Sequence, residues 1–176
     1  MENWLAPLPG AGEIVVLLSP PRELLLSLVA ALALDGPLLA LDAGNQFDAY
    51  RLARLIRRRT GDLYGALGRV RVSRAFTCYQ VVALFERLPE STMPHVVFDL
   101  PATFYDESVP VAESYRLLRV ALGHAGRVSR SAPVVISVRP PQSADRAALL
   151  TAVVRMADRL LTWEEPPGMA APRLFS

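Results

Sequence analysis

Lysine is absent from this sequence, and all 19 of its basic residues are arginine. The absence excludes two chemistries that depend on a lysine side chain. One is the formation of a Schiff base with a carbonyl substrate, and the other is the contact of a P-loop lysine with the β- and γ-phosphates of a nucleotide. Both exclusions hold whether the bias toward arginine is genomic or thermal in origin.

Cysteine and histidine are also scarce. The single cysteine, Cys78, cannot form an internal disulfide, and we expect it to begin a helix as a small, partly buried residue. The two histidines, His95 and His124, lack the spacing of metal ligands, so we expect structural roles for both and no metal site. A nucleophilic pair of Cys78 and His95 is the less favoured alternative.

Long apolar runs are missing as well. The longest uncharged apolar stretch, Leu24–Leu34, is shorter than the roughly 20 residues that cross a bilayer, so no membrane partner is expected. Residues 1–12 contain no basic segment followed by an apolar run, which argues against a signal peptide. Together with the lone cysteine, these features predict a cytoplasmic protein.

The sequence does contain enough apolar residues for a sizeable core. Its 176 residues suit one domain, and 52% of them are hydrophobic while 20% are charged. The formal net charge of +2 does not by itself indicate a protein that binds nucleic acid.

Short apolar runs alternate with helical segments along the chain. Most runs are continuous, as in strands that are covered on both faces. The expected strands are Ile14–Leu18, Leu38–Leu41, Val70–Val72, Val96–Leu100, Val134–Val138 and Leu160–Trp163. The expected helices are Glu23–Leu34, Phe47–Arg59, Gln80–Leu88, Val111–Leu122 and Ala144–Ala157. In the second of these helices, Phe47, Tyr50, Ala53 and Ile56 should form the apolar face.

This alternation predicts βαβ units, and hence an α/β domain of three layers around a mostly parallel sheet of five or six strands. We expect the domain to span residues 13–165. Residues 1–12 and 166–176 are rich in proline, glycine and alanine, and should be arms that are either disordered or docked on another copy.

Ligands of such a sheet bind beyond the carboxyl ends of its strands, where the first strand leads into Ser19-Pro20-Pro21-Arg22. A P-loop needs about eight residues here, with glycines whose N–H groups surround the phosphates. This connection has no glycine, and its two prolines have no N–H. We expect a tight turn in which Ser19 is the N-cap and Arg22 either forms a surface ion pair or holds an anion.

Three later segments read ALDAGNQFDAYRLARLIRR, VRVSRAFTCYQVVALFERL and HVVFDLPATFYDE. Their order resembles the ATPase core of the RecA/RadA recombinases, over roughly residues 13–163. The resemblance implies a RecA-like fold. It matches Asp99 to the Walker B aspartate, which helps to hold Mg²⁺, and Asp42 to the aspartate that opens the second-strand motif. It also matches Arg74, Phe76 and Gln80 to the segment of the third strand.

Two departures from the family pattern change the expected chemistry. The P-loop is absent, and the motif Ala43-Gly44-Asn45-Gln46 has no counterpart of the glutamate that polarises the attacking water. Gln46 could position a water molecule, but without a phosphate cradle it has little to act on. The resulting degenerate nucleotide site comprises Ser19, Arg22, Asp42, Gln46 and Asp99, and we expect no catalytic residue and no cofactor.

The expected function is therefore a RecA-like module that does not hydrolyse ATP. It would act as an assembly or accessory factor in DNA repair or recombination, with a protein partner or a second copy. One alternative is a DNA-binding protein that uses an arginine patch of Arg57, Arg58, Arg59 and Arg74. Another is an atypical nucleotide-binding enzyme that uses Asp99, Arg22 and a helix N-terminus. We expect Asp106 and Glu107 to be solvated loop charges rather than a metal site.

Overall fold

A computed structural model describes residues 9–163, so the predicted tail at 166–176 and most of the predicted arm at 1–12 lie outside the described residues. The described chain forms one sheet in the order β3-β2-β4-β5-β1-β6, and all neighbouring strands are parallel. The strands are β1 (Ile14–Leu18), β2 (Leu38–Asp42), β3 (Val70–Arg74), β4 (His95–Phe98), β5 (Val134–Val138) and β6 (Arg159–Thr162).

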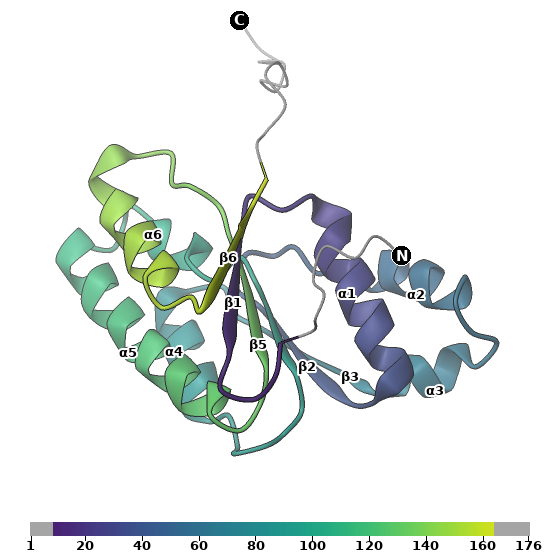
Figure 1. The fold of residues 1–176 in the computed structure, drawn as a ribbon. Coiled ribbons are helices and arrows are strands. Elements are labelled where there is room, and N and C mark those ends of the chain that lie inside the picture. The colour runs from purple at the N-terminus through teal and green to yellow at the C-terminus, as the bar shows by residue number, and fades with distance from the viewer. Residues whose placement is uncertain (1–8, 164–176) are drawn as a thin grey trace, which may run out of the picture.

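Helices cover both faces of this sheet (Figure 1). The α-helices are α1 (Arg22–Asp35), α2 (Ala49–Arg57), α3 (Leu63–Gly68), α4 (Cys78–Glu86), α5 (Val111–Ser129) and α6 (Ala147–Val154), with 3-10 turns η1 (Ala102–Tyr105) and η2 (Ala144–Arg146). The predicted three-layer α/β domain is confirmed, and its parallel sheet is consistent with a RecA-like core. None of the described helices is both long enough and apolar enough to span a membrane.

The inner strands explain why the sequence shows continuous apolar runs. Every residue of β2, β4 and β5 is buried, because each strand has helices above and below it. Neighbouring residues of a strand point to opposite layers. Val15 and Leu17 of β1 accordingly pack with α1, α2 and α3, whereas Val16 packs with α4, α5 and α6. The edge strands β3 and β6 are more exposed.

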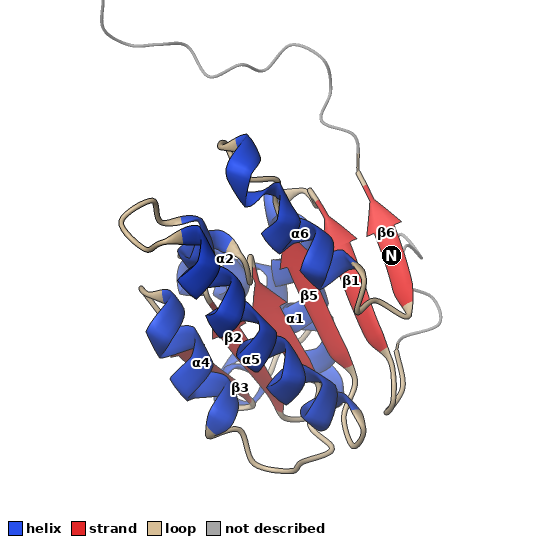
Figure 2. Cartoon of the chain, turned by 90° about the vertical axis from the view of Figure 1, so that its left-hand side faces the viewer, coloured by secondary structure: helices blue, strands red, loops and turns tan. Residues whose placement is uncertain are grey.

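The connections between strands diverge at two places in the sheet. The chain passes from β1 to β2 and from β2 to β3 through the layer of α1, α2 and α3, and its later crossovers use the layer of α4, α5 and α6 (Figures 1 and 2). The loops after β1 and β5 therefore leave neighbouring strands toward opposite layers, as do the loops after β2 and β4. Such switch points are where open α/β sheets bind ligands.

The turn between β1 and α1 corrects one prediction. Ser19 is not the N-cap, because α1 begins at Arg22 and Pro21 occupies the cap position. Ser19 instead has a positive φ of 54°, and its N–H donates to the carbonyl of Val138 at 2.9 Å. The connection is as short as predicted, but its first residue is tied to β5 rather than to the helix.

The second helical segment also differs from its prediction. α2 begins at Ala49 rather than Phe47, because the carboxylate of Asp48 accepts a hydrogen bond from the Arg51 N–H at 2.9 Å and caps the helix. Leu52 is buried on its core face, whereas Tyr50, which we placed on that face, is 74% exposed. The short helix α3 was missed.

Three other boundaries moved. α4 begins at Cys78 rather than Gln80, because the Thr77 side chain accepts from the Gln80 N–H. The expectation that Cys78 begins a helix is thus confirmed, but the residue is fully rather than partly buried. α5 runs beyond the expected end at Leu122 as far as Ser129, so His124 lies within the helix. The last predicted helix is divided into η2 and α6.

His95 generates a prediction about stability. It begins β4 with 1% of its surface exposed, and burial lowers the pKa of its imidazole below 6.5. Neither ring nitrogen has a hydrogen-bond partner. In the unfolded chain the His95 imidazole binds a proton near pH 6.5, whereas in the folded chain it stays neutral to a lower pH. The free energy of unfolding should therefore decrease as the pH falls below 6.5.

Denaturant unfolding of wild type and His95→Leu between pH 7.5 and pH 5 measures this effect. As the pH falls, the free energy of unfolding of the wild type should decrease by up to about 1.4 kcal/mol per pH unit more than that of the variant. Parallel pH profiles of the two proteins would contradict the assignment to His95.

Candidate functional site at the carboxyl edge of the sheet

Three strained residues follow three strands at one edge of the sheet. Ser19, Asn45 and Asp99 have φ values of 54°, 53° and 48°, and they are the non-glycine residues with positive φ in the described chain. They follow β1, β2 and β4. A left-handed conformation costs a non-glycine residue roughly 1–2 kcal/mol, and such residues gather at functional sites. The geometry therefore marks the carboxyl edge of the sheet as the candidate site.

Asp99 is the buried acid of this edge. The residue is 7% exposed, its N–H donates to the Ser137 hydroxyl at 2.8 Å, and its Oδ1 has no hydrogen-bond partner. Burial raises the pKa of this carboxyl, and the positive charge of Arg139 on the neighbouring strand end offsets part of that rise. A buried carboxylate oxygen without a partner opposes folding, so Asp99 is not explained by stability.

Arg139 and Tyr105 surround Asp99. The Arg139 guanidinium donates to the carbonyl of Pro20 at 3.0 Å, and the Tyr105 hydroxyl donates to the carbonyl of Arg139 at 2.9 Å. Burial raises the pKa of the Tyr105 hydroxyl, and the nearby Asp99 charge adds to this shift. These contacts join the ends of β1, β4 and β5 into one polar cluster.

Asp42 has a different environment from Asp99, although the resemblance placed both in the nucleotide site. Its side chain is fully buried and accepts hydrogen bonds from the N–H groups of Gln46 at 2.9 Å and Phe47 at 3.1 Å. It also forms an ion pair with Arg74, with 2.8 Å between the guanidinium Nε and the carboxylate. Asp42 therefore holds the turn after β2 in shape, and the protein itself satisfies its carboxylate.

Gly44 brings this turn against Asp99. A Cβ atom added at Gly44 would lie 2.5 Å from the Asp99 Cβ, which is closer than real Cβ contacts come. The backbone after β2 and the side chain after β4 therefore touch, and only a glycine leaves the space for this approach. Beside them, the Phe47 and Phe98 rings meet edge to face with centroids 5.6 Å apart.

The turn after β1 offers little to a phosphate. Pro20 and Pro21 have no N–H, and the Ser19 N–H is bonded to Val138. The Leu24 N–H, in the first turn of α1, donates to the Pro21 carbonyl at 3.0 Å. A triphosphate cradle requires a series of N–H groups that converge on the ligand. The residues present therefore do not fit the nucleotide that the resemblance implies.

A polar groove lies beside this turn, between the start of α1 and the start of α2. It has a volume of about 400 Å³, and Arg22 and Gln46 are among its lining residues. The cation of Arg51, which also lines it, is compensated by Asp48 at 3.3 Å and Glu23 at 4.0 Å. The structure thus brings together Arg22 and Gln46 of the predicted site, while Asp42 and Asp99 do not line the groove.

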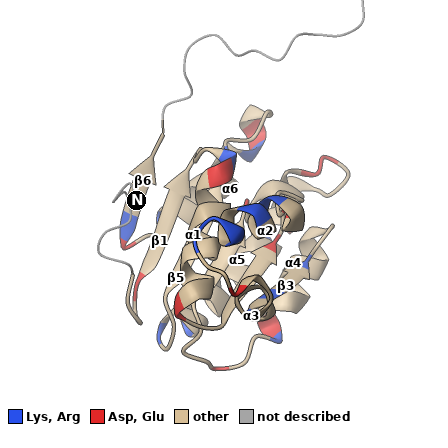
Figure 3. Cartoon of the chain, turned by 90° about the vertical axis from the view of Figure 1, so that its right-hand side faces the viewer, with Lys and Arg blue, Asp and Glu red and all other residues tan. Residues whose placement is uncertain are grey.

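The predicted arginine patch is divided between two edges of the domain. Arg57, Arg58 and Arg59 are exposed at the end of α2, which begins near the carboxyl edge and runs away from it. Arg74 is at the carboxyl edge and is paired with Asp42. Figure 3, which looks onto the layer of α1, α2 and α3, shows basic and acidic segments interspersed.

The loop between β4 and α5 contains two acidic residues that we expected to be solvated, and it is held by an arginine that we did not predict. Asp106 and Glu107 are exposed, and hydrogen bonds from Ser108 lower the pKa of Asp106. No group of three or more histidine, cysteine or acidic residues gathers in the described part of the chain. Arg146, which sequence reasoning missed, is buried and donates to the carbonyls of Phe104 and Val109 at 2.9 and 2.8 Å, so it fixes the loop between β4 and α5.

Comparisons with known proteins leave the site to be interpreted from its own geometry. No protein-family model matches the sequence, and no curated protein matches it. Arg139 and Tyr105, which surround Asp99, carried no sequence signal, because their roles follow from strand order rather than from a motif.

The contact between Gly44 and Asp99 yields a mutational prediction. Gly44→Ala should lower the free energy of unfolding by about 1–3 kcal/mol, because the two Cβ atoms cannot both be accommodated without a backbone shift. The matched control is Gly123→Ala in α5, where an added Cβ meets nothing within 4 Å. That variant should be neutral or stabilising by up to about 1 kcal/mol. Equal effects of both substitutions in urea unfolding would contradict the close approach.

Asp99 yields a prediction of increased stability, in contrast to the loss expected for Gly44→Ala. Because its pKa is raised in the folded state, its contribution to stability is present at acid pH and is lost as the pH rises through the folded-state pKa. Asp99→Asn should therefore raise the melting temperature at pH 7, by about 2–4 °C for a gain near 1 kcal/mol. The gain should shrink toward pH 3. A variant that melts below the wild type at pH 7 would show that the ionised carboxylate stabilises the fold.

Proposed function

We propose that this chain is a RecA-like module that does not hydrolyse ATP and that serves protein assembly in DNA repair or recombination. The process comes from the resemblance of Leu38–Leu88 and of the strand before Asp99 to recombinase motifs. The lack of hydrolysis comes from the site itself.

The observation that carries the proposal is the turn between β1 and α1. Its two prolines and the hydrogen bond from Ser19 to Val138 leave no series of amide donors at the switch point beside β5. Phosphoryl transfer depends on positioning and charge stabilisation at the phosphates. Without the P-loop lysine and without a series of amide donors from the turn, this edge lacks the family's phosphate cradle and the cation that belongs to it.

The neighbouring turns support the same conclusion. The aspartate that opens the second-strand motif, Asp42, is used to hold Gln46, Phe47 and Arg74 in place. Gln46 has its N–H bound to that carboxylate. The motif residues thus maintain the shape of the edge, which is what a module needs if it presents a RecA-like surface to another protein.

One observation favours the enzyme alternative as a second candidate. The Oδ1 atom of Asp99 is buried and has no partner, and perturbed acids at a switch point are frequent in catalytic sites. A metal-bound nucleotide would have to reach Asp99 past Gly44, without help from the turn after β1.

Isothermal titration with Mg-ATP separates the two candidates. We expect no binding heat at protein concentrations of tens of micromolar, since the turn cannot surround phosphates. A micromolar dissociation constant that is lost in Asp99→Asn would overturn the proposal and favour the enzyme.

Assembly and DNA binding are measured separately. Light scattering should detect self-association of the chain, and a strict monomer at high concentration would restrict the proposal to assembly with a different protein. Fluorescence anisotropy with duplex DNA tests the arginine alternative. Tight binding that weakens steeply between 50 and 200 mM salt, and that Arg57→Gln/Arg58→Gln reduces, would favour direct DNA recognition.

A further inference from the structure

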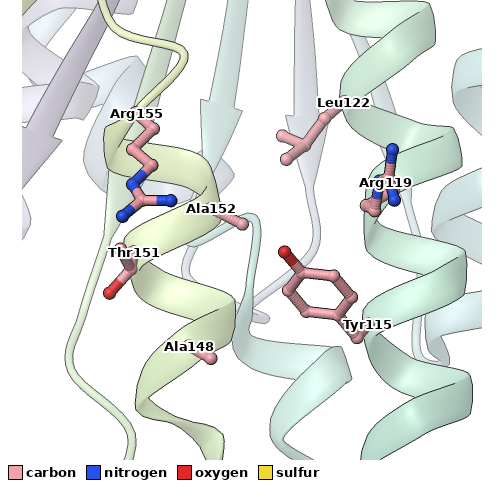
Figure 4. A pocket seen from close by; sticks show the side chains of 7 residues that line it. All are labelled: Tyr115, Arg119, Leu122, Ala148, Thr151, Ala152 and Arg155. Atoms are coloured by element: carbon pink, nitrogen blue, oxygen red, sulfur yellow. The ribbon is translucent and has the colours of Figure 1, made fainter.

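A groove runs between α5 and α6 on the face opposite α1, away from the carboxyl-edge site. We call it the α5–α6 groove. It has a volume of about 530 Å³ and is lined by Tyr115, Arg119 and Leu122 of α5 and by Ala148, Ala152 and Arg155 of α6, among others (Figure 4). Both helices follow strands of the same parallel sheet and run side by side in Figure 2. The groove is therefore open to solvent along about 10 Å of helix.

The groove combines an apolar floor with two cationic walls. Leu122 projects into it from α5, and the small side chains of Ala148 and Ala152 face it from α6. Arg119 and Arg155 stand on opposite sides, and neither forms an ion pair with another described residue. The neighbouring Arg116, by contrast, is paired with Glu113 at 2.8 Å.

Tyr115 adds a feature typical of protein interfaces. It is 39% exposed, and its ring points from α5 toward α6 with the hydroxyl inside the groove. Tyrosine and arginine are the residues most enriched at interface centres, where they surround small apolar pockets. The groove is thus suited to an extended segment that presents acidic side chains next to an apolar one.

The chain itself contains such a segment beyond Trp163. Residues 164–176 read EEPPGMAAPRLFS, so two adjacent glutamates are followed by an apolar side chain at Met169. Three residues lie between Glu165 and Met169, so the two positions can be at most about 14 Å apart, which is enough to span the roughly 10 Å of helix along the groove. The charges are complementary, because Glu164 and Glu165 are acidic and the groove is bounded by two arginines.

The last described residue before the acidic pair lies on the other face of the sheet from the groove. Trp163 packs in the cluster that contains α1, on the face of the sheet opposite α5 and α6. Glu164 and Glu165 follow it directly and can lie only about 7 Å from it. The occupant that fits both the charges and this restriction is the same segment of another molecule.

We propose that the α5–α6 groove of one copy binds residues 164–176 of a second copy, with Glu164 and Glu165 pairing with Arg119 and Arg155 and with Met169 against the apolar floor. The inference specifies the self-association form of the proposed assembly function and rests on it. Because groove and tail are different surfaces, each copy in a pair keeps one of them free, and the assembly extends as an open chain.

Two neutral variants test the pairing at low salt, where charge pairs are least screened. Arg119→Gln/Arg155→Gln removes the cationic walls but keeps the tail, and Glu164→Gln/Glu165→Gln removes the acidic pair but keeps the groove. In light scattering, wild type should form species larger than a dimer as its concentration rises. Each variant alone should associate at least about tenfold more weakly, and an equimolar mixture of the two should give a dimer that does not grow.

The matched control is Arg57→Gln/Arg58→Gln, which removes two exposed arginines from α2 and should leave association unchanged. Circular dichroism melting confirms that each variant is folded. A monomeric wild type would overturn the inference and leave only assembly with another protein. Association that survives Arg119→Gln/Arg155→Gln would overturn the inference while self-assembly stands. Association that requires the arginines but not the glutamates would assign the groove to a different acidic occupant.

Discussion

The turn after β1 offers a ligand no amide hydrogen from Ser19, Pro20 or Pro21, and the interpretation of this protein depends on that constraint. At that switch point a parallel α/β sheet usually presents backbone N–H groups to an anion. Here Pro20 and Pro21 have none, and Ser19 donates its own to β5. Arg139 then closes the turn through the Pro20 carbonyl. The strongest phosphate-binding position of the fold is thereby converted into a structural junction between β1 and β5.

The two aspartates of the recombinase-like motifs show how the same residue type is used in two ways. Asp42 is fully satisfied by two N–H groups and a guanidinium, so its burial stabilises the turn after β2. Asp99 is nearly as buried but keeps one oxygen without a partner, so its ionised form opposes folding. Gly44 allows the two turns to touch, because it has no Cβ atom to collide with Asp99. Asp42 therefore has a structural role, whereas the burial of Asp99 is not explained by stability and points to a functional role.

Association through α5 and α6 agrees with this division of the molecule. The ends of β1, β4 and β5 are joined by side-chain contacts, whereas the outer face of the α4–α6 layer has a groove with an apolar floor between two arginines that form no ion pair with another described residue. An interface gains from such partly exposed aromatic and arginine side chains, because each buries a large area when a partner binds. On the function that we propose, the working surface is a helical face rather than a strand end.

The sequence by itself determined the α/β class, the order of its strands along the chain and the absence of a P-loop after the first strand. Continuous apolar runs and prolines act locally, through strand burial and missing N–H groups, so they can be interpreted without tertiary contacts. It did not determine that Tyr50 is exposed or that α3 exists, because caps such as Asp48 and Asp62 decided where the helices begin. Only the tertiary structure showed that Asp42 is satisfied by the protein whereas one oxygen of Asp99 is not. It also showed that Arg74 lies at a different edge of the domain from Arg57. Strand order sets those neighbours, and strand order arises from long-range pairing that no single segment encodes.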